Sequence, residues 1–132
     1  MKEDRYLRAL IRFLSESRHE TYGGFEQAPV SELELWSSLI REEAEELLEA
    51  LKEEDVLQTA DGVADLLYVV FGACVSLNLP VGELFDEVHR SNMTKLGGGA
   101  EKRNDGKIEK GAEYSPPDIS GVLARHQVDP KP

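Results

Sequence analysis

Apolar side chains recur every three or four positions along most of the first 96 residues, which is the spacing of helices that bury one face. The pattern predicts helices over residues 4–17, about 32–53, 56–78 and 80–96. There is no internal repeat and no strong alternation of apolar and polar residues that would indicate strands. The sequence therefore predicts an all-α fold with four main helices.

Local signals suggest where these helices begin and end. Ser31 is the expected N-cap of the second helix, with Glu34 three residues later completing a capping box. The polar stretch 52–55 is a short turn, so the helices on either side of it should form an antiparallel hairpin. Three glycines at 97–99 should end the fourth helix, and Asp118 should cap a short final helix.

Length and charge narrow the possible partners. With 132 residues, the chain should form one domain, with a helical core over about 4–96 and a loop and tail over about 97–132. The net charge of −11 argues against nucleic acid as a partner, because binding to its backbone requires a basic surface. A small phosphorylated ligand is still possible, since a divalent cation can bridge carboxylates and phosphates.

The compartment can also be predicted. No apolar stretch reaches the roughly 20 residues needed to span a bilayer, and the first residues lack the apolar core of a signal peptide. The single cysteine, Cys74, cannot form an internal disulfide, which suits a reducing compartment. We therefore expect a cytoplasmic protein, or one in the host cytoplasm if the source is viral, with no membrane partner.

Acidic residues interrupt the apolar stripe of the second helix. On a helical wheel centred on Trp36, Glu43 falls within about 20° of the centre of the stripe. Glu46 lies at one edge and Glu42 further round, whereas Glu45 points away and should be hydrated. The third helix has the same anomaly, because Asp61 and Asp65 share one stripe with Tyr68 and Gly72.

The predicted hairpin brings these acids together. It sets Glu46 opposite Asp61 and Glu43 opposite Asp65, with no Lys or Arg on the same stripes. Inward carboxylates would repel each other strongly without a cation, and oxygen ligands without His or Cys indicate Mg²⁺ or Mn²⁺. The alternative is a charged hairpin whose acids all reach solvent. A di-iron site of the ferritin type would need two Glu-x-x-His motifs, and only residues 16–19 fit.

The fourth helix carries complementary groups at its end. Asn92 and Lys95 extend the stripe formed by Val81, Leu84 and Val88. Lys binds phosphate well, and the Asn amide can hydrogen-bond a base, a sugar or a phosphate. Beside an acidic metal site, these two residues become candidate substrate contacts.

Four segments together resemble one protein family. They are LIREEAEELLEAL, ADGVADLLYVVFGA, FDEVHRSNMTKLG and DGKIEKGAEYSPPDI, and HETYG at 19–23 resembles the short motif that follows the first helix of that family. Over about residues 13–123 the chain is similar to the MazG-like branch of the all-α NTP pyrophosphohydrolases, and more narrowly to its phosphoribosyl-ATP-pyrophosphohydrolase-like members.

The resemblance extends to the metal-binding signature of this family, Glu-Glu-x-x-Glu followed by Glu-x-x-Asp. The first half is matched by Glu42, Glu43 and Glu46, and the final position by Asp65. The chain departs from the pattern at Gly62, where the family has Glu. Asp61 could replace the missing carboxylate, because residues four apart share a helix face.

The resemblance implies a four-helix antiparallel bundle with a glycine-rich loop and a short C-terminal helix, assembling as a homodimer or homotetramer. It also implies hydrolysis of a (deoxy)nucleoside triphosphate between the α and β phosphates, giving the monophosphate and pyrophosphate. Two or three Mg²⁺ ions, or Mn²⁺ as a substitute, would bind Glu43, Glu46, Asp61 and Asp65, and Glu42 or Glu43 would be catalytic. The candidate substrate-binding residues are His19, Tyr22, Tyr68, Asn92, Lys95, Lys107, Lys110 and Tyr114.

Two other functions remain open. A non-catalytic regulator of the same fold would bind nucleotide or metal without turnover, and the departure at Gly62 is the feature that supports it. A structural helical oligomer would do neither. The spacing of the residues does not distinguish a purine from a pyrimidine base.

Overall fold

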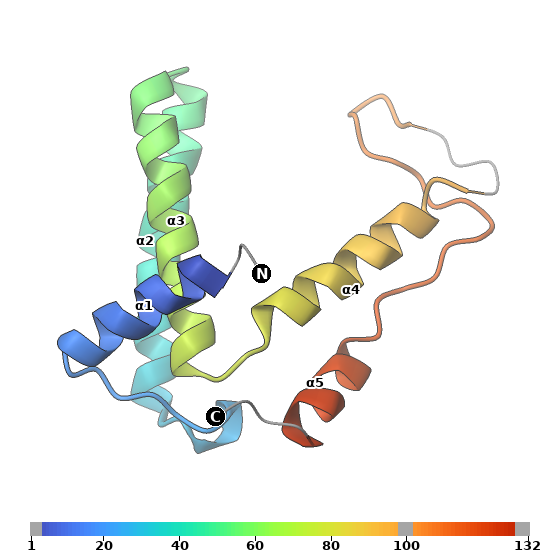
Figure 1. Cartoon of the computed structure of the whole chain (residues 1–132). Coiled ribbons are helices and arrows are strands. Elements are labelled where there is room, and N and C mark those ends of the chain that lie inside the picture. Colours follow the sequence, from blue (N-terminus) through green and yellow to red (C-terminus); the bar gives the residue numbers. More distant parts are fainter. Residues whose placement is uncertain (1–3, 98–101, 129–132) are drawn as a thin grey trace. The chain divides into compact units, whose positions relative to one another are not determined.

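The computed structural model describes residues 4–97 and 102–128, which form five α-helices and one short 3-10 helix (Figure 1). The described residues contain no strand beyond one isolated bridge between Lys102 and Ile108, so the predicted all-α class is confirmed. The chain divides into two compact units, Met1–Leu79 and Pro80–Pro132, and each is described by itself.

The first unit is a helical hairpin with a third helix packed on it. It contains α1 (Asp4–Glu16), the 3-10 helix η1 (Phe25–Gln27), α2 (Val30–Lys52) and α3 (Val56–Ser76). α2 and α3 run antiparallel along most of their length, and α1 packs against α3 (Figure 1). The predicted hairpin turn lies between Lys52 and Val56, where the Asp55 side chain caps α3 by accepting a hydrogen bond from the backbone N–H of Gln58.

The core of this unit lies where the three helices meet. Leu14, Trp36 and Ala73 form a buried cluster, one from each helix, with Leu39 and Ile40 packed against it. A Cβ at Gly72 would lie 2.8 Å from the Trp36 ring. Glycine at this position therefore lets the indole pack against the backbone of α3.

The predicted cap of α2 is wrong. The helix begins at Val30, and Pro29 occupies the N-cap position in an extended conformation, with φ −69° and ψ 157°. Ser31 therefore lies inside the first turn and makes no capping bond. Proline suits the start of a helix, because its fixed φ is compatible with the entering chain and its missing N–H is not needed there.

The expectation that no apolar stretch is long enough to span a bilayer is wrong for α3. By length and composition alone, Val56–Ser76 could cross a membrane, although core helices of soluble proteins pass the same test. Only 28% of its most apolar stretch is buried within the chain. α3 therefore has an apolar surface that the first unit does not cover.

The second unit contains α4 (Val81–Thr94) and α5 (Ile119–Val128), which contact each other. Asp118 caps α5 as predicted, because its Oδ1 accepts a hydrogen bond from the Gly121 backbone N–H at 3.0 Å. The expected glycine stop after α4 falls mostly outside the described residues, which end at 97 and resume at 102. The place of α4 as the fourth helix of a bundle, and the single domain, stay predictions.

Candidate functional site

Three carboxylates meet across the α2–α3 hairpin. Glu43 and Glu46 of α2 and Asp65 of α3 each place one oxygen so that all three lie within 4.8 Å of one another. Glu43 and Asp65 are half-buried and Glu46 is exposed. Two residues three apart on one helix face meet a third from the facing helix, which is the arrangement expected of an antiparallel hairpin.

Glu43 has the least favourable surroundings of the three. Its Oε2 is buried and has no hydrogen-bond partner. Burial raises the pKa of the Glu43 carboxyl, and the nearby charges of Glu46, Asp65 and Glu42 raise it further. None of the ion pairs within residues 4–97 and 102–128 involves the three clustered carboxylates. An unpaired oxygen among like charges, with oxygen donors only, fits a divalent cation such as Mg²⁺ or Mn²⁺.

Asp61 and Glu42 are neighbours of the clustered residues along their helices, one turn before Asp65 and directly before Glu43. Both are exposed, and Asp61 is not one of the three residues whose oxygens converge. Glu42 is close enough for its charge to raise the pKa of Glu43. The roles predicted for Asp61 as a ligand and for Glu42 as a base are untested by this geometry and stay predictions.

Gly62, the position at which the chain departs from the family pattern, packs closely against α2. Gly62 is buried, and a Cβ there would lie 3.2 Å from the Leu47 Cα and 3.3 Å from its Cβ. The position therefore faces the backbone of α2 instead of the carboxylates. A side chain at this point would therefore require Leu47 to shift by a few tenths of an ångström.

An aromatic pair lies one helical turn from Asp65. Tyr68 of α3 and Phe13 of α1 pack edge to face, with ring centroids 5.7 Å apart, and both side chains are exposed. Tyr68 is a predicted substrate contact, whereas Phe13 was not singled out. The signal for Phe13 was weak, because an aromatic residue on an amphipathic helix is usually part of the core.

A second carboxylate, Glu32, lies almost fully buried near the start of α2. Its side chain is 8% exposed, and its Oε2 accepts hydrogen bonds from the Trp36 indole at 2.7 Å, the His19 ring at 2.6 Å and the Ser76 hydroxyl. Because a carboxylate only accepts, His19 donates through Nε2. Burial alone would raise the pKa of Glu32, but the hydrogen bonds from Ser76, His19 and Trp36 outweigh it and lower the pKa.

This cluster ties the connection after α1 to α2 and α3. Ser76 and His19 both point at the same carboxylate oxygen, so they do not form the Ser–His pair of a nucleophilic triad. Tyr22, another predicted substrate contact, donates its backbone N–H to the Ser76 carbonyl at 2.8 Å. Burial raises the pKa of Tyr22, and Glu20 and Glu32 add to this effect.

Sequence reasoning missed Glu32, although a signal existed. Glu32 lies four residues before Trp36, about 40° away on the helical wheel, and therefore within the apolar stripe. Two of the residues that donate hydrogen bonds to the Glu32 carboxylate, His19 and Ser76, lie 13 and 44 positions away in the sequence. Periodicity within one helix carries no information about those partners.

The remaining predicted substrate contacts all lie in the second unit. Asn92 is exposed on α4, and Lys95 is the C-cap residue of that helix. Lys107 is exposed in the turn closed by the Lys102–Ile108 bridge. Further along, the Lys110 Nζ lies 4.7 Å from the centre of the Tyr114 ring, a cation–π contact.

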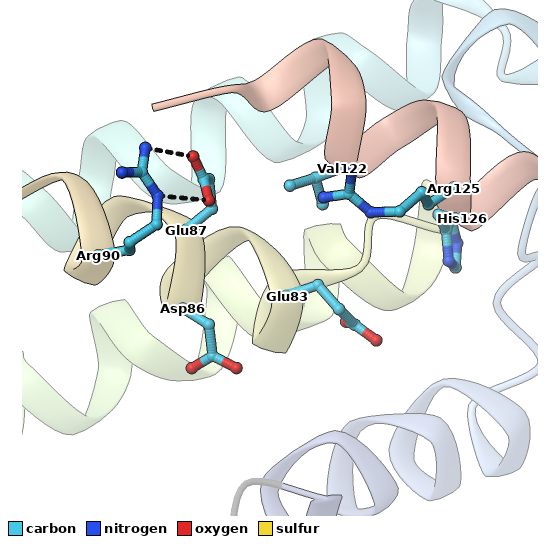
Figure 2. A pocket seen from close by; sticks show the side chains of 7 residues that line it. All are labelled: Glu83, Asp86, Glu87, Arg90, Val122, Arg125 and His126. Atoms are coloured by element: carbon cyan, nitrogen blue, oxygen red, sulfur yellow. Dashed lines mark hydrogen bonds and ion pairs between the residues drawn. The ribbon is translucent and has the colours of Figure 1, made fainter. Parts of the chain in front are cut away.

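Unit 2 also contains a pocket of about 520 Å³ between α4 and α5. Figure 2 shows Arg90 and Glu87 of α4 joined by hydrogen bonds at its edge, with Arg125 and His126 of α5 nearby. None of the predicted site residues lines this pocket. Its charged groups hold parts of the unit together and are distinct from the acidic cluster on the hairpin.

One known protein family matches the region of the chain that contains the acidic hairpin. The sequence model of one family, described as phosphoribosyl-ATP pyrophosphohydrolase, matches residues 7–92, more than half of the 132-residue chain. The matched region includes all three clustered carboxylates and Asn92. No match was found among curated proteins. The chain belongs to the phosphoribosyl-ATP pyrophosphohydrolase family, within the all-α MazG-like superfamily.

Proposed function

We propose that this protein is a Mg²⁺-dependent nucleoside triphosphate pyrophosphohydrolase that cleaves the bond between the α and β phosphates. Membership of a pyrophosphohydrolase family supports a hydrolase acting on phosphoanhydride bonds, and it implies a divalent metal dependence and a nucleotide substrate. The observation that carries the finer proposal is the convergence of Glu43, Glu46 and Asp65, with a buried, unpaired oxygen on Glu43.

The carboxylates of the hairpin would have two different roles, metal binding and proton transfer. Glu43, Glu46 and Asp65 would hold the divalent ions, with Asp61 as a further candidate ligand. Bound Mg²⁺ would neutralise the triphosphate and align it for in-line attack. Glu42, exposed beside the cluster, would accept a proton from the attacking water, with Glu43 as the alternative base.

The cationic residues of the second unit would bind the substrate phosphates. Lys95, Lys107 and Lys110 supply positive charge, which the cluster of Glu43, Glu46 and Asp65 lacks. Tyr68 would contact the nucleoside from the hairpin, because it lies one turn from Asp65 with its ring exposed.

Self-association would cover the apolar surface of the first unit. Large apolar side chains are exposed along α1 and α3 and at the tip of the hairpin, including Phe13, Leu48, Leu57 and Leu67. Exposed large apolar side chains in such number on one unit support burial in a homodimer or homotetramer. Sedimentation velocity over a range of concentrations would test this; a monomer at every concentration would contradict it.

Product analysis tests the proposed reaction. The protein would be incubated with Mg²⁺ and each of the common ribo- and deoxyribonucleoside triphosphates, and the products followed by ³¹P NMR. The proposal predicts pyrophosphate and a nucleoside monophosphate from at least one of them. Retained nucleotide without product would instead indicate a binding protein, and release of orthophosphate would place the cleavage at a different bond.

A further inference from the structure

In the second unit, residues 115–118 lie along one face of α4. Their partners are Glu87, Arg90, Ser91 and Thr94, whose spacing of three or four residues places them on the same side of the helix. Here a short extended segment is recognised largely through its backbone, by side chains from a single helix.

Ser115 is hydrogen-bonded at both of its backbone polar groups. The Thr94 Oγ1 accepts the Ser115 backbone N–H at 2.8 Å and donates to the Ser91 carbonyl at 2.6 Å. The Ser91 Oγ donates to the Ser115 carbonyl at 2.8 Å, and Ser91 is only 2% exposed. Both backbone groups of Ser115 are therefore held by hydroxyl groups at the end of α4.

Two charged residues extend this attachment. Arg90 donates to the Pro116 carbonyl at 3.1 Å, and Glu87 accepts the Asp118 backbone N–H at 2.7 Å. Hydrogen bonds from Arg90, and then from the Asp118 backbone, lower the pKa of Glu87 to about 2. Arg90 and Glu87 therefore add two further attachments of the segment to α4.

This attachment brings two candidate substrate-binding residues, Lys95 and Tyr114, to the same end of α4. Lys95 directly follows Thr94, and Tyr114 directly precedes Ser115. The hydrogen bonds between Thr94 and Ser115 therefore bring the Lys110–Tyr114 pair to the end of α4 that carries Lys95. The two cations lie 15 residues apart in the sequence, and the hydrogen bonds of Thr94 with Ser115 are the attachment nearest to both of them.

We propose that Thr94, supported by Ser91, is a positioning residue that assembles Lys95 and Lys110 into one binding site for a polyphosphate chain. The inference rests on the proposed function, and it adds that the phosphate-binding lysines depend on a hydroxyl that touches no phosphate. If Thr94 serves only to stabilise the fold, its loss would change stability and leave the affinity for polyphosphate unaltered.

The test uses inorganic tripolyphosphate with Mg²⁺ as the probe and isothermal titration calorimetry of the full-length protein. Thr94→Val keeps the side-chain shape and removes the hydroxyl. Its affinity should fall about tenfold, the effect of losing roughly one hydrogen bond that orders the site. Thr59→Val in α3 is the matched control, because Thr59 belongs to the first unit and takes no part in the hydrogen bonds that hold residues 115–118, and it should bind like the wild type.

A double-mutant cycle separates positioning from general stability. If Thr94 acts through Lys110, then Thr94→Val should weaken binding little further in a Lys110→Met protein. An equal loss in both backgrounds would overturn the proposal, and so would wild-type affinity in Thr94→Val or failure of the wild type to bind tripolyphosphate. Should Thr94→Val not fold, judged by circular dichroism, Ser91→Ala provides the same comparison.

This experiment does not depend on turnover. A wild-type protein that binds tripolyphosphate, loses affinity through Thr94→Val and yet releases no pyrophosphate from any nucleotide would refute the proposed function alone. Conversely, normal pyrophosphate release with unaltered tripolyphosphate affinity in Thr94→Val would refute the positioning role alone.

Discussion

Glu43 and Asp65 hold carboxylate oxygens within 4.8 Å of each other, although one lies on α2 and the other on α3. Without a cation, this proximity opposes folding, since two ionised carboxylates repel each other. The raised pKa of Glu43 is the expected consequence, with burial as its largest cause. The hairpin therefore keeps an arrangement that is unfavourable for stability unless an ion is bound.

The first prediction concerns the stability of the metal-free protein. Because the folded pKa of Glu43 is raised, the folded state binds this proton more tightly than the unfolded state. The stabilisation is present below the ordinary pKa of Glu and is lost as pH rises through the raised value. In excess chelator at pH 7, Glu43→Gln should therefore melt at a higher temperature than the wild type, and the difference should vanish at about pH 3. A lower melting temperature for Glu43→Gln at pH 7 would contradict the argument.

Metal removal gives the second prediction. Hydrolysis should stop in excess chelator and return when Mg²⁺ or Mn²⁺ is added beyond the chelator, because both ions accept oxygen ligands. Pyrophosphate release is the measurement. Undiminished release in the presence of chelator would rule out catalysis by ions held on the hairpin.

Asp61 gives the third prediction. Asp61 lies one turn before Asp65, and Gly62 faces the α2 backbone, so Asp61 is the available replacement for the missing family carboxylate. We expect Asp61→Asn to weaken Mn²⁺ binding about tenfold and to reduce turnover with it. Unchanged affinity and rate would show that Glu43, Glu46 and Asp65 suffice. Glu49→Gln, on the hydrated side of α2, is the control.

Much of this molecule follows from local patterns. Apolar spacing predicts the helices to within a few residues, because each buries one face, and the polar turn at 52–55 predicts the hairpin. In a helical hairpin, the register of the two helices decides which residues face each other. Once the turn is placed, the positions of Glu43 and Asp65 on the helical wheel are enough to predict that they meet. Carboxylates in an apolar stripe are an unusual signal, because burying them alone is costly.

The contacts that could not be predicted join residues far apart in the chain. Glu32 depends on Ser76, and Thr94 depends on Ser115, across 44 and 21 positions. Ser and Thr are also common on exposed helix faces, so their presence in the sequence indicates nothing special. The start of α2 was missed for a different reason: Pro29 allows the helix to begin without a side-chain cap, and the Ser31 motif was therefore misleading.

The fourth prediction concerns Glu32. Its lowered pKa means that its contribution to stability is present above the ordinary pKa of Glu and is lost as pH falls through the lowered folded value. Glu32→Gln should lower the free energy of unfolding by about 2 kcal/mol at pH 7, because three donors lose a charged acceptor. The difference from the wild type should shrink on acidification.

Urea unfolding followed by the emission of Trp36 measures this effect directly. Trp36 is the only tryptophan in the chain, and its indole donates to Glu32. Glu34→Gln, an exposed residue on the same helix, should leave both the midpoint and the emission maximum unchanged. A Glu32→Gln protein as stable as the wild type would show that this buried carboxylate is not needed for the fold.

The central claim is that the carboxylates converging on the α2–α3 hairpin form the catalytic metal site. Its most direct test compares pyrophosphate release by Glu43→Gln and Glu45→Gln under saturating Mg²⁺, with the best nucleotide substrate. Glu43 belongs to the cluster, whereas Glu45 lies exposed two residues away. The account predicts that Glu43→Gln loses activity by at least about 100-fold while Glu45→Gln keeps it. A Glu43→Gln protein that turns over at the wild-type rate would contradict it.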